Sequence, residues 1–92
     1  MNEKQLESKV TQYCKEHGLY CRKFSSPAHR GVPDRIIVGK GRIMFLELKS
    51  PGKKPTQLQL REIELIRAAG CMALWTDSWE HAKREIDYLF SL

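Results

Sequence analysis

The sequence has no long apolar run and no stretch of biased composition. No run approaches the roughly 20 apolar residues that a membrane-spanning helix needs, so no membrane span is predicted. The polar start MNEKQLESK is unlike a secretory signal, and we therefore expect a cytoplasmic protein. Because no composition shift divides the chain, we expect residues 1–92 to form one domain with a single modest core, which must carry the function.

Cysteine is scarce, with only three residues in the chain. An odd number of cysteines among apolar residues fits reduced core thiols better than a disulfide framework. Cys14, His17, Cys21 and His29 fall close together, but their spacing matches no paired zinc knuckle, and Cys14 falls on the apolar face of a predicted helix. The sequence therefore does not favour a zinc site.

Acidic residues are outnumbered by basic ones, eleven against sixteen, which gives a formal net charge of +5. A surplus of positive charge favours anionic partners such as nucleic acid or an acidic membrane surface. The net charge therefore favours a protein that binds or acts on anions.

Hydrophobic periodicity predicts seven elements. Residues 3–17 form a helix that Asn2 can cap and Gly18 can end. Strands are predicted over 19–24, 35–39, 42–50 and 71–76, and helices over 57–69 and from residue 79 onward. The long crossover before the last strand makes that strand parallel to 42–50, while a short turn makes 35–39 and 42–50 antiparallel. The prediction is an α/β fold with a central mixed four-stranded sheet flanked by helices, in the order αβββαβα.

The two later helices each show an apolar arc. The arc of helix 57–69 is expected to be its inner face and comprises Leu58, Ile63, Leu65, Ile66 and Ala69; that of the last helix comprises Trp79, Ala82, Ile86, Leu89 and Phe90. Gln59 and Glu62 project within the arc of helix 57–69, and an inward amide needs a partner. Leu60 and Tyr88 fall outside the buried stripes, where they could belong to a dimer face.

Two acids are predicted to lie at the same end of the sheet. Asp34 opens the strand 35–39 and Glu47 lies late in the antiparallel strand 42–50. Since side chains alternate along a strand, Glu47 and Lys49 share one face. Whether Asp34 shares that face depends on the pairing register.

The turn between these strands decides the register. A three-residue turn would set Asp34 opposite Leu46 and would leave the two carboxylates on different faces. A two-residue loop of Lys40 and Gly41 is a common hairpin type and sets Asp34 opposite Glu47. We expect the two-residue loop, and hence both carboxylates on one face.

Two carboxylates this close repel each other, by several kcal/mol at about 4 Å, and a single lysine relieves this only in part. A divalent cation would relieve it, and Mg²⁺ or Mn²⁺ prefers such oxygen ligands. An adjacent lysine can orient an attacking water or, as a neutral amine, deprotonate it, and these groups together are the equipment for phosphodiester hydrolysis. The simpler interpretation is that Asp34 caps a turn and Glu47 only pairs with Lys49.

The motifs GVPD (31–34) and LELKSPGKKPTQLQ (46–59) resemble the PD-(D/E)XK nuclease superfamily, and in particular its VRR-NUC branch, over nearly the whole chain. This resemblance implies a restriction-endonuclease-like core. It also implies a set of site residues: Asp34, Glu47 and the backbone carbonyl of Leu48 as metal ligands, Glu7 as a direct or water-mediated ligand, Lys49 acting on the nucleophilic water, and Gln59 orienting Lys49 or a phosphate. Two of these positions have competing interpretations, since Thr56 and Gln59 form a capping box and Glu7 could be a solvated helix residue.

The resemblance further implies a substrate. The branch includes small dimeric enzymes that cleave branched DNA such as four-way junctions, and larger repair nucleases whose additional domains have no counterpart in this sequence. We therefore expect a Mg²⁺- or Mn²⁺-dependent, structure-selective DNA endonuclease, resembling a Holliday-junction resolvase and acting as a homodimer. The competing hypotheses are a non-catalytic DNA-binding module with a structural acidic cluster, and a protein-interaction domain.

Several cations could contact DNA phosphates near such a site. The candidates are Arg22, Lys23, His29, Arg30, Arg35, Lys53 and Lys54. His29 and Arg30 are favoured because they lie in the loop that leads to Asp34, whereas Lys40 and Arg42 lie at the far end of the hairpin.

Overall fold

The structure, a computed structural model, describes residues 1–92 and contains the seven predicted elements in the predicted order. They are α1 (Glu3–Glu16), β1 (Tyr20–Lys23), β2 (Arg35–Gly39), β3 (Arg42–Leu48), α2 (Gln57–Ala68), β4 (Met72–Thr76) and α3 (Trp79–Phe90). Strand β3 ends at Leu48, two residues earlier than expected. None of the helices has both the length and the apolar character needed to cross a membrane.

The four strands form one sheet in the order β1-β2-β3-β4. The pairs β1–β2 and β2–β3 are antiparallel, and β3–β4 is parallel. The mixed sheet and the central position of β3 are therefore confirmed. Because β3 has a neighbour on each side, it holds Glu47 in the middle of the sheet rather than on an edge.

The hairpin turn has the predicted two-residue form. Lys40 and Gly41 both adopt positive φ angles, 51° and 72°, as a tight hairpin turn requires. Gly39 is then opposite Arg42, and Arg35 is opposite Leu46. Continuing this register by one residue sets Asp34 opposite Glu47, which confirms the pairing on which the site depends.

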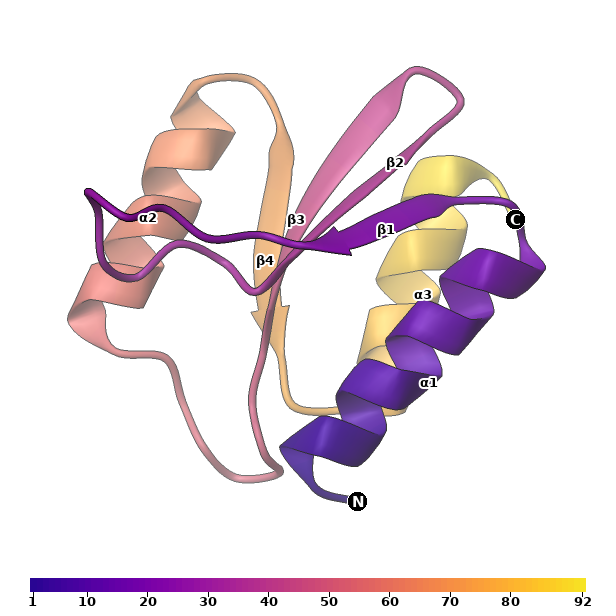
Figure 1. Ribbon diagram of the computed structural model, residues 1–92, viewed down its shortest axis with the longest axis horizontal. Helices are drawn as coiled ribbons and strands as arrows, with labels where there is room; N and C mark the ends of the chain where they lie inside the picture. The colour runs from indigo at the N-terminus through magenta and orange to yellow at the C-terminus, as the bar shows by residue number, and fades with distance from the viewer.

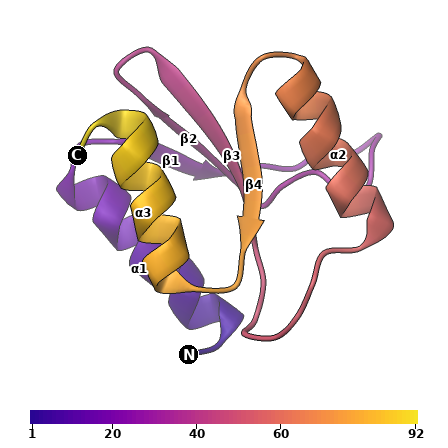
Figure 2. The ribbon, with the colours of Figure 1, turned by 180° about the vertical axis from the view of Figure 1, so that it is seen from behind.

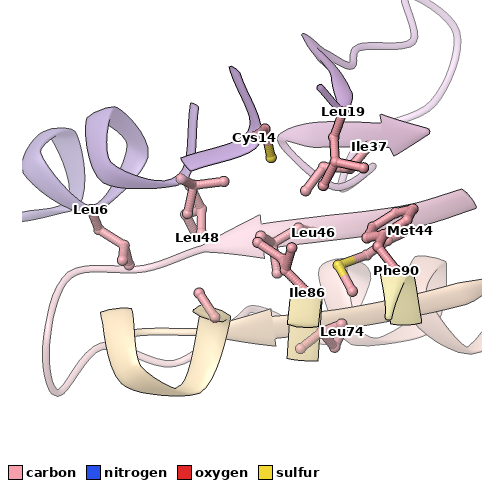
Figure 3. Close-up of a cluster of buried hydrophobic side chains, with 12 residues drawn as sticks. Leu6, Cys14, Leu19, Ile37, Met44, Leu46, Leu48, Leu74, Ile86 and Phe90 are labelled. Atoms are coloured by element: carbon pink, nitrogen blue, oxygen red, sulfur yellow. The ribbon is translucent and has the colours of Figure 1, made fainter. Parts of the chain in front are cut away.

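The helices lie on both faces of the sheet. Helices α1 and α3 lie side by side against one face, and α2 lies alone against the other (Figures 1 and 2). The main core fills the space under α1 and α3, where side chains such as Leu6, Leu46 and Ile86 meet (Figure 3). Leu46 and Leu48 point into this core, so Glu47, between them, points to the α2 side.

Each helix begins at a residue that caps it. The Asn2 side chain accepts a hydrogen bond from the Gln5 N–H, and the Gln5 side chain accepts one from the Asn2 N–H, which completes a capping box. Thr56 caps α2 and Ser78 caps α3 through side-chain oxygens. These caps fix where α1 and α2 begin, and both starts border the end of the sheet that carries Asp34 and Glu47.

The predicted inner face of α2 is wrong in part. Ile63 is buried, but Leu58 and Leu65 are 54% and 49% exposed, and Ala69 is exposed. Because α2 is the only helix on its face (Figure 2), no second helix packs against the rest of its apolar arc. Of the two residues predicted to fall outside the buried stripes, Tyr88 is 80% exposed, whereas Leu60 is half-buried.

Candidate active site

Asp34 is fixed by a backbone contact at the end of the β2–β3 hairpin. Its Oδ2 accepts a hydrogen bond from the Leu48 N–H at 2.9 Å. Its own carbonyl accepts the Phe24 N–H at 2.8 Å, which extends the β1–β2 pairing by one step. The carboxylate is therefore held against the Glu47–Leu48 peptide, with its second oxygen left for another partner.

Glu47 and Lys49 project from the end of β3. Glu47 is 2% exposed, and its Oε2 lies 3.2 Å from the Lys49 Nζ. Its other oxygen, Oε1, is buried and has no hydrogen-bond partner. Lys49 follows β3 directly, and its N–H donates to the Thr76 carbonyl, so its backbone is fixed by β4. The two oxygens of Glu47 thus have different environments, one paired and one unpaired.

The protonation of Glu47 reflects this environment. Burial, followed by the negative charge of Asp34, raises the pKa of Glu47 from 4.5 to about 7, and the hydrogen bond from Lys49 offsets this only in part. Glu3 adds a smaller effect in the same direction. A carboxylate pair that one lysine does not neutralise can accept further positive charge.

An acidic hollow opens beside these residues, between α1 and the start of β2. It has a volume of about 380 Å³ and is bordered by Glu3, Glu7, Lys23, Phe24 and Asp34, together with Lys4. The amino end of α1 and the carboxyl end of β3 lie at the same end of the molecule (Figure 1). Sequence reasoning missed Glu3, although its spacing of four residues from Glu7 places the two acids on the same side of the helix.

Glu7 reaches the hollow but has a partner already. Its Oε2 lies 3.3 Å from the Arg35 Nη2. Arg35 was predicted as a DNA-binding residue, but its side chain is only 12% exposed and its Nε is buried without a partner. The physical reason is the register: Arg35 is opposite Leu46, so it points under α1 rather than to the surface. Arg35 thus pairs with Glu7 beneath α1 and is not a surface cation.

Gln59 lies at the start of α2 and takes part in a capping box. Its Oε1 accepts a hydrogen bond from the Thr56 N–H at 2.9 Å, and its own N–H donates to the Thr56 hydroxyl. The structure therefore shows the capping box that competes with a catalytic role for Gln59, and it shows no hydrogen bond between Gln59 and Lys49.

The other predicted cations lie around the site at the surface. His29 and Arg30 are exposed in the loop before Asp34, and Lys53 and Lys54 are exposed in the turn after Lys49. These four side chains have no ion-pair partner in the structure. Lys23 borders the acidic hollow directly.

The donor set fits a hard divalent cation. The unpaired buried Oε1 of Glu47 and the second oxygen of Asp34 are carboxylate oxygens, the ligands that Mg²⁺ and Mn²⁺ prefer. No three side chains of His, Cys, Asp or Glu converge closely enough to hold a metal by themselves. A metal here would therefore need backbone carbonyl or water ligands as well, as Mg²⁺ usually has.

Comparison with known proteins relates this geometry to a family. No protein-family sequence model matches the chain. The chain is 39% identical over 79 residues to "Putative nuclease p44" of Acyrthosiphon pisum secondary endosymbiont phage 1, covering 85% of each protein. Among solved structures, it is similar to a "VRR_NUC domain" with a TM-score of 0.84 and 27% identity, covering 94% of this chain and 95% of that one.

A second solved structure, a "VRR_NUC domain protein", superposes with the same TM-score of 0.84. It covers 99% of this chain and 89% of its own, and at 20% identity it supports the fold alone. The sequence relative and the first solved structure carry the assignment further, because each matches most of both chains. The chain belongs to the VRR-NUC nuclease family.

Proposed function

We propose that this protein is a cytoplasmic, Mg²⁺- or Mn²⁺-dependent DNA endonuclease. The observation that carries the proposal is the convergence of Asp34, Glu47 and Lys49, in which Glu47 keeps one buried oxygen without a partner. A buried acceptor left unpaired costs about 1–3 kcal/mol, so its persistence needs a functional reason. The family relationship points to the same chemistry.

Each site residue has a role in this proposal. Asp34, Glu47 and the Leu48 carbonyl would hold the metal, which when bound supplies positive charge to the phosphate and lowers the pKa of water. Lys49, anchored beside Glu47, would orient the attacking water and the phosphate through its ammonium. It would take the proton of the water only as a neutral amine, after releasing its own proton to solvent. Glu7, fixed by Arg35, would act through water at the edge of the acidic hollow.

Gln59 keeps a narrower role in the proposal. Its amide oxygen is occupied by the cap of α2, so its amide nitrogen, which only donates, would be left to contact a phosphate rather than the Lys49 ammonium. His29, Arg30, Lys53 and Lys54 would contact the DNA backbone, because they are exposed and carry no competing ion pair.

For the substrate we propose branched DNA, cut by a homodimer. A four-way junction has paired scissile strands, and a two-fold dimer would offer one active site to each strand. Tyr88, which is 80% exposed on α3, offers candidate surface for the second copy.

The test is a cleavage assay on labelled four-way junction, flap and plain duplex, with Mg²⁺, with Mn²⁺ or with EDTA. We expect cleavage by the wild type only with metal, none by Asp34→Asn, and a loss of about 10²–10⁴-fold for Lys49→Ala. Lys40→Ala, an exposed lysine at the far hairpin end, is the matched control and should cleave normally.

Metal-independent binding without any cleavage would instead support a non-catalytic DNA-binding module, and equal cleavage by all variants would reveal a contaminant. Sedimentation with and without junction reports whether a dimer forms.

A further inference from the structure

A second hollow lies on the α2 side of the sheet, and neither Lys49 nor any proposed metal ligand borders it. It has a volume of about 360 Å³ and opens between the loop after β1 and helix α2. Phe45 comes from β3, Phe24 directly follows β1, His29 lies in the loop, and Glu62 and Leu65 come from α2. Because Leu65 is 49% exposed at its rim, the hollow is open to solvent.

The walls of this hollow are largely apolar and aromatic. The rings of Phe24 and Phe45 meet edge to face, with centroids 5.1 Å apart and planes inclined by 69°. Both rings are only half-buried, since no other helix covers this part of the sheet. A flat apolar group is therefore the kind of ligand that would gain most by entering.

Three polar side chains, those of Ser26, His29 and Glu62, also border the hollow, and Glu62 is the only acid among them. It is half-buried on the apolar arc of α2, and it makes no ion pair and no side-chain hydrogen bond. Asp34, Glu7 and Glu47 by contrast each have at least one partner. An ionised carboxylate only accepts hydrogen bonds, so the ligand should carry an N–H donor on a flat ring.

The two hollows adjoin. Phe24 borders both the acidic hollow with Asp34 and the apolar hollow with Glu62. The intervening loop is held firmly on α2, because a Cβ at Gly31 would lie 3.0 Å from the Leu58 backbone and Gly31 has a φ of +85°. The distance between the hollows is therefore set by the fold, and one ligand could extend over both.

We propose that this apolar hollow binds one unpaired nucleobase of the DNA, with its face on the phenylalanine walls and an amino group donating to Glu62. The inference rests on the proposed nuclease function, which supplies DNA as the ligand. Cytosine, adenine and guanine all have an exocyclic amino group that can reach a carboxylate. A base at a branch point or bulge leaves the stack at little cost, so such a pocket favours branched or distorted DNA over intact duplex.

The test measures binding, not cleavage. Fluorescence anisotropy in EDTA compares DNA duplexes with a single-nucleotide bulge that is either cytosine or an abasic site. We expect the wild type to bind the cytosine bulge about tenfold more tightly, the size of one charge-assisted hydrogen bond. Glu62→Gln should reduce this preference to about threefold, because a neutral amide oxygen accepts more weakly while stacking on the phenylalanines remains. Glu64→Gln, an exposed acid two residues along α2, should keep the full preference.

Two results would overturn the proposal. The first is equal binding of the cytosine and abasic bulges by the wild type. The second is a Glu62→Gln variant that binds all DNA more tightly by the same factor, which would mean that Glu62 only repels phosphates. Failure of the nuclease function is distinguishable, because it would show as absent cleavage by a protein that still discriminates between the two bulges.

Discussion

Glu47 shows most directly how one residue joins stability to function. Its side chain is almost fully buried in the middle of the sheet, where an aliphatic residue would pack without cost. Instead it carries a carboxylate next to a second acid, Asp34, with one oxygen unpaired. Lys49 relieves this unfavourable arrangement only in part, so the metal-free fold bears a free-energy cost at this residue.

This cost predicts how Glu47→Gln behaves without metal. The pKa of Glu47 is raised in the folded state to about 7. Its contribution to the free energy of unfolding is therefore fully present below its ordinary pKa of 4.5 and is lost as the pH rises through 7. In EDTA at pH 8, Glu47→Gln should therefore be more stable than the wild type, by about 3 kcal/mol, with little difference at pH 4.5. Urea unfolding at both pH values measures this, and cleavage with Mg²⁺ should be abolished.

The control for this variant is Glu62→Gln, which removes a charge that is not buried against another acid. It should show no comparable gain between pH 4.5 and pH 8. If Glu47→Gln is less stable than the wild type at pH 8 in EDTA, the ion pair with Lys49 outweighs the burial of the charge. Glu47 would then be primarily a structural residue.

At this scale the sequence predicted the acids but not all of their partners. The proximity of Asp34 and Glu47 follows from strand alternation and from one turn, both of which are local properties. The ion pair of Arg35 with Glu7 depends on how α1 packs on the sheet, which no local pattern specifies. For the same reason Arg35 was predicted to be a surface cation.

At the scale of elements, α2 combines a structural cap with a proposed catalytic position. Thr56 and Gln59 share the capping box, so an alanine substitution at either residue removes a cap interaction. Only Gln59 is proposed to contact the site. The two roles can therefore be separated by comparing the two residues.

We expect Thr56→Ala to lose about 1 kcal/mol of stability, the usual cost of an N-cap, and to keep its cleavage rate. Gln59→Ala should lose a similar or smaller amount of stability and, in addition, about tenfold or more in rate. Thermal unfolding and single-turnover cleavage on the same preparations measure both quantities. Equal rates for the two variants would show that Gln59 serves only the cap.

The burial of α2 shows why helix periodicity is an incomplete predictor. Its apolar arc was read correctly as a helix face, but Leu58 and Leu65 remain at the surface. Helices α1 and α3 pack against each other as well as against the sheet, so their arcs are covered, whereas α2 has no such neighbour (Figure 1). Periodicity gives the direction of a face, and the number of elements packed there decides how much of it is buried.

At the scale of the whole molecule, the element order, the mixed sheet and the hairpin register all agree with the sequence-based predictions. They do so because caps, turns and alternation each act over a few residues and point to the same fold. The acidic hollow was not predicted as a cavity, because it forms only where α1 meets the end of the sheet. The net positive charge likewise does not tell where the individual lysines and arginines lie, and only the structure locates them.

The positions of these basic side chains predict how the affinity for DNA depends on salt concentration. The exposed cations near the site are His29, Arg30, Lys53 and Lys54, while Lys40 lies at the opposite end of the hairpin. Each phosphate contact releases counterions and contributes about −0.9 to the slope of log K against log salt concentration on duplex DNA. Lys53→Ala and Lys54→Ala should therefore each make the slope less negative by about one, whereas Lys40→Ala should leave it unchanged.

Arg35→Gln should destabilise the fold by removing the partner of Glu7, without altering the slope. Anisotropy titrations from 50 to 200 mM KCl measure these slopes, and a change for Lys40→Ala as large as that for Lys53→Ala would mean that DNA is bound by net charge alone, with no preferred face.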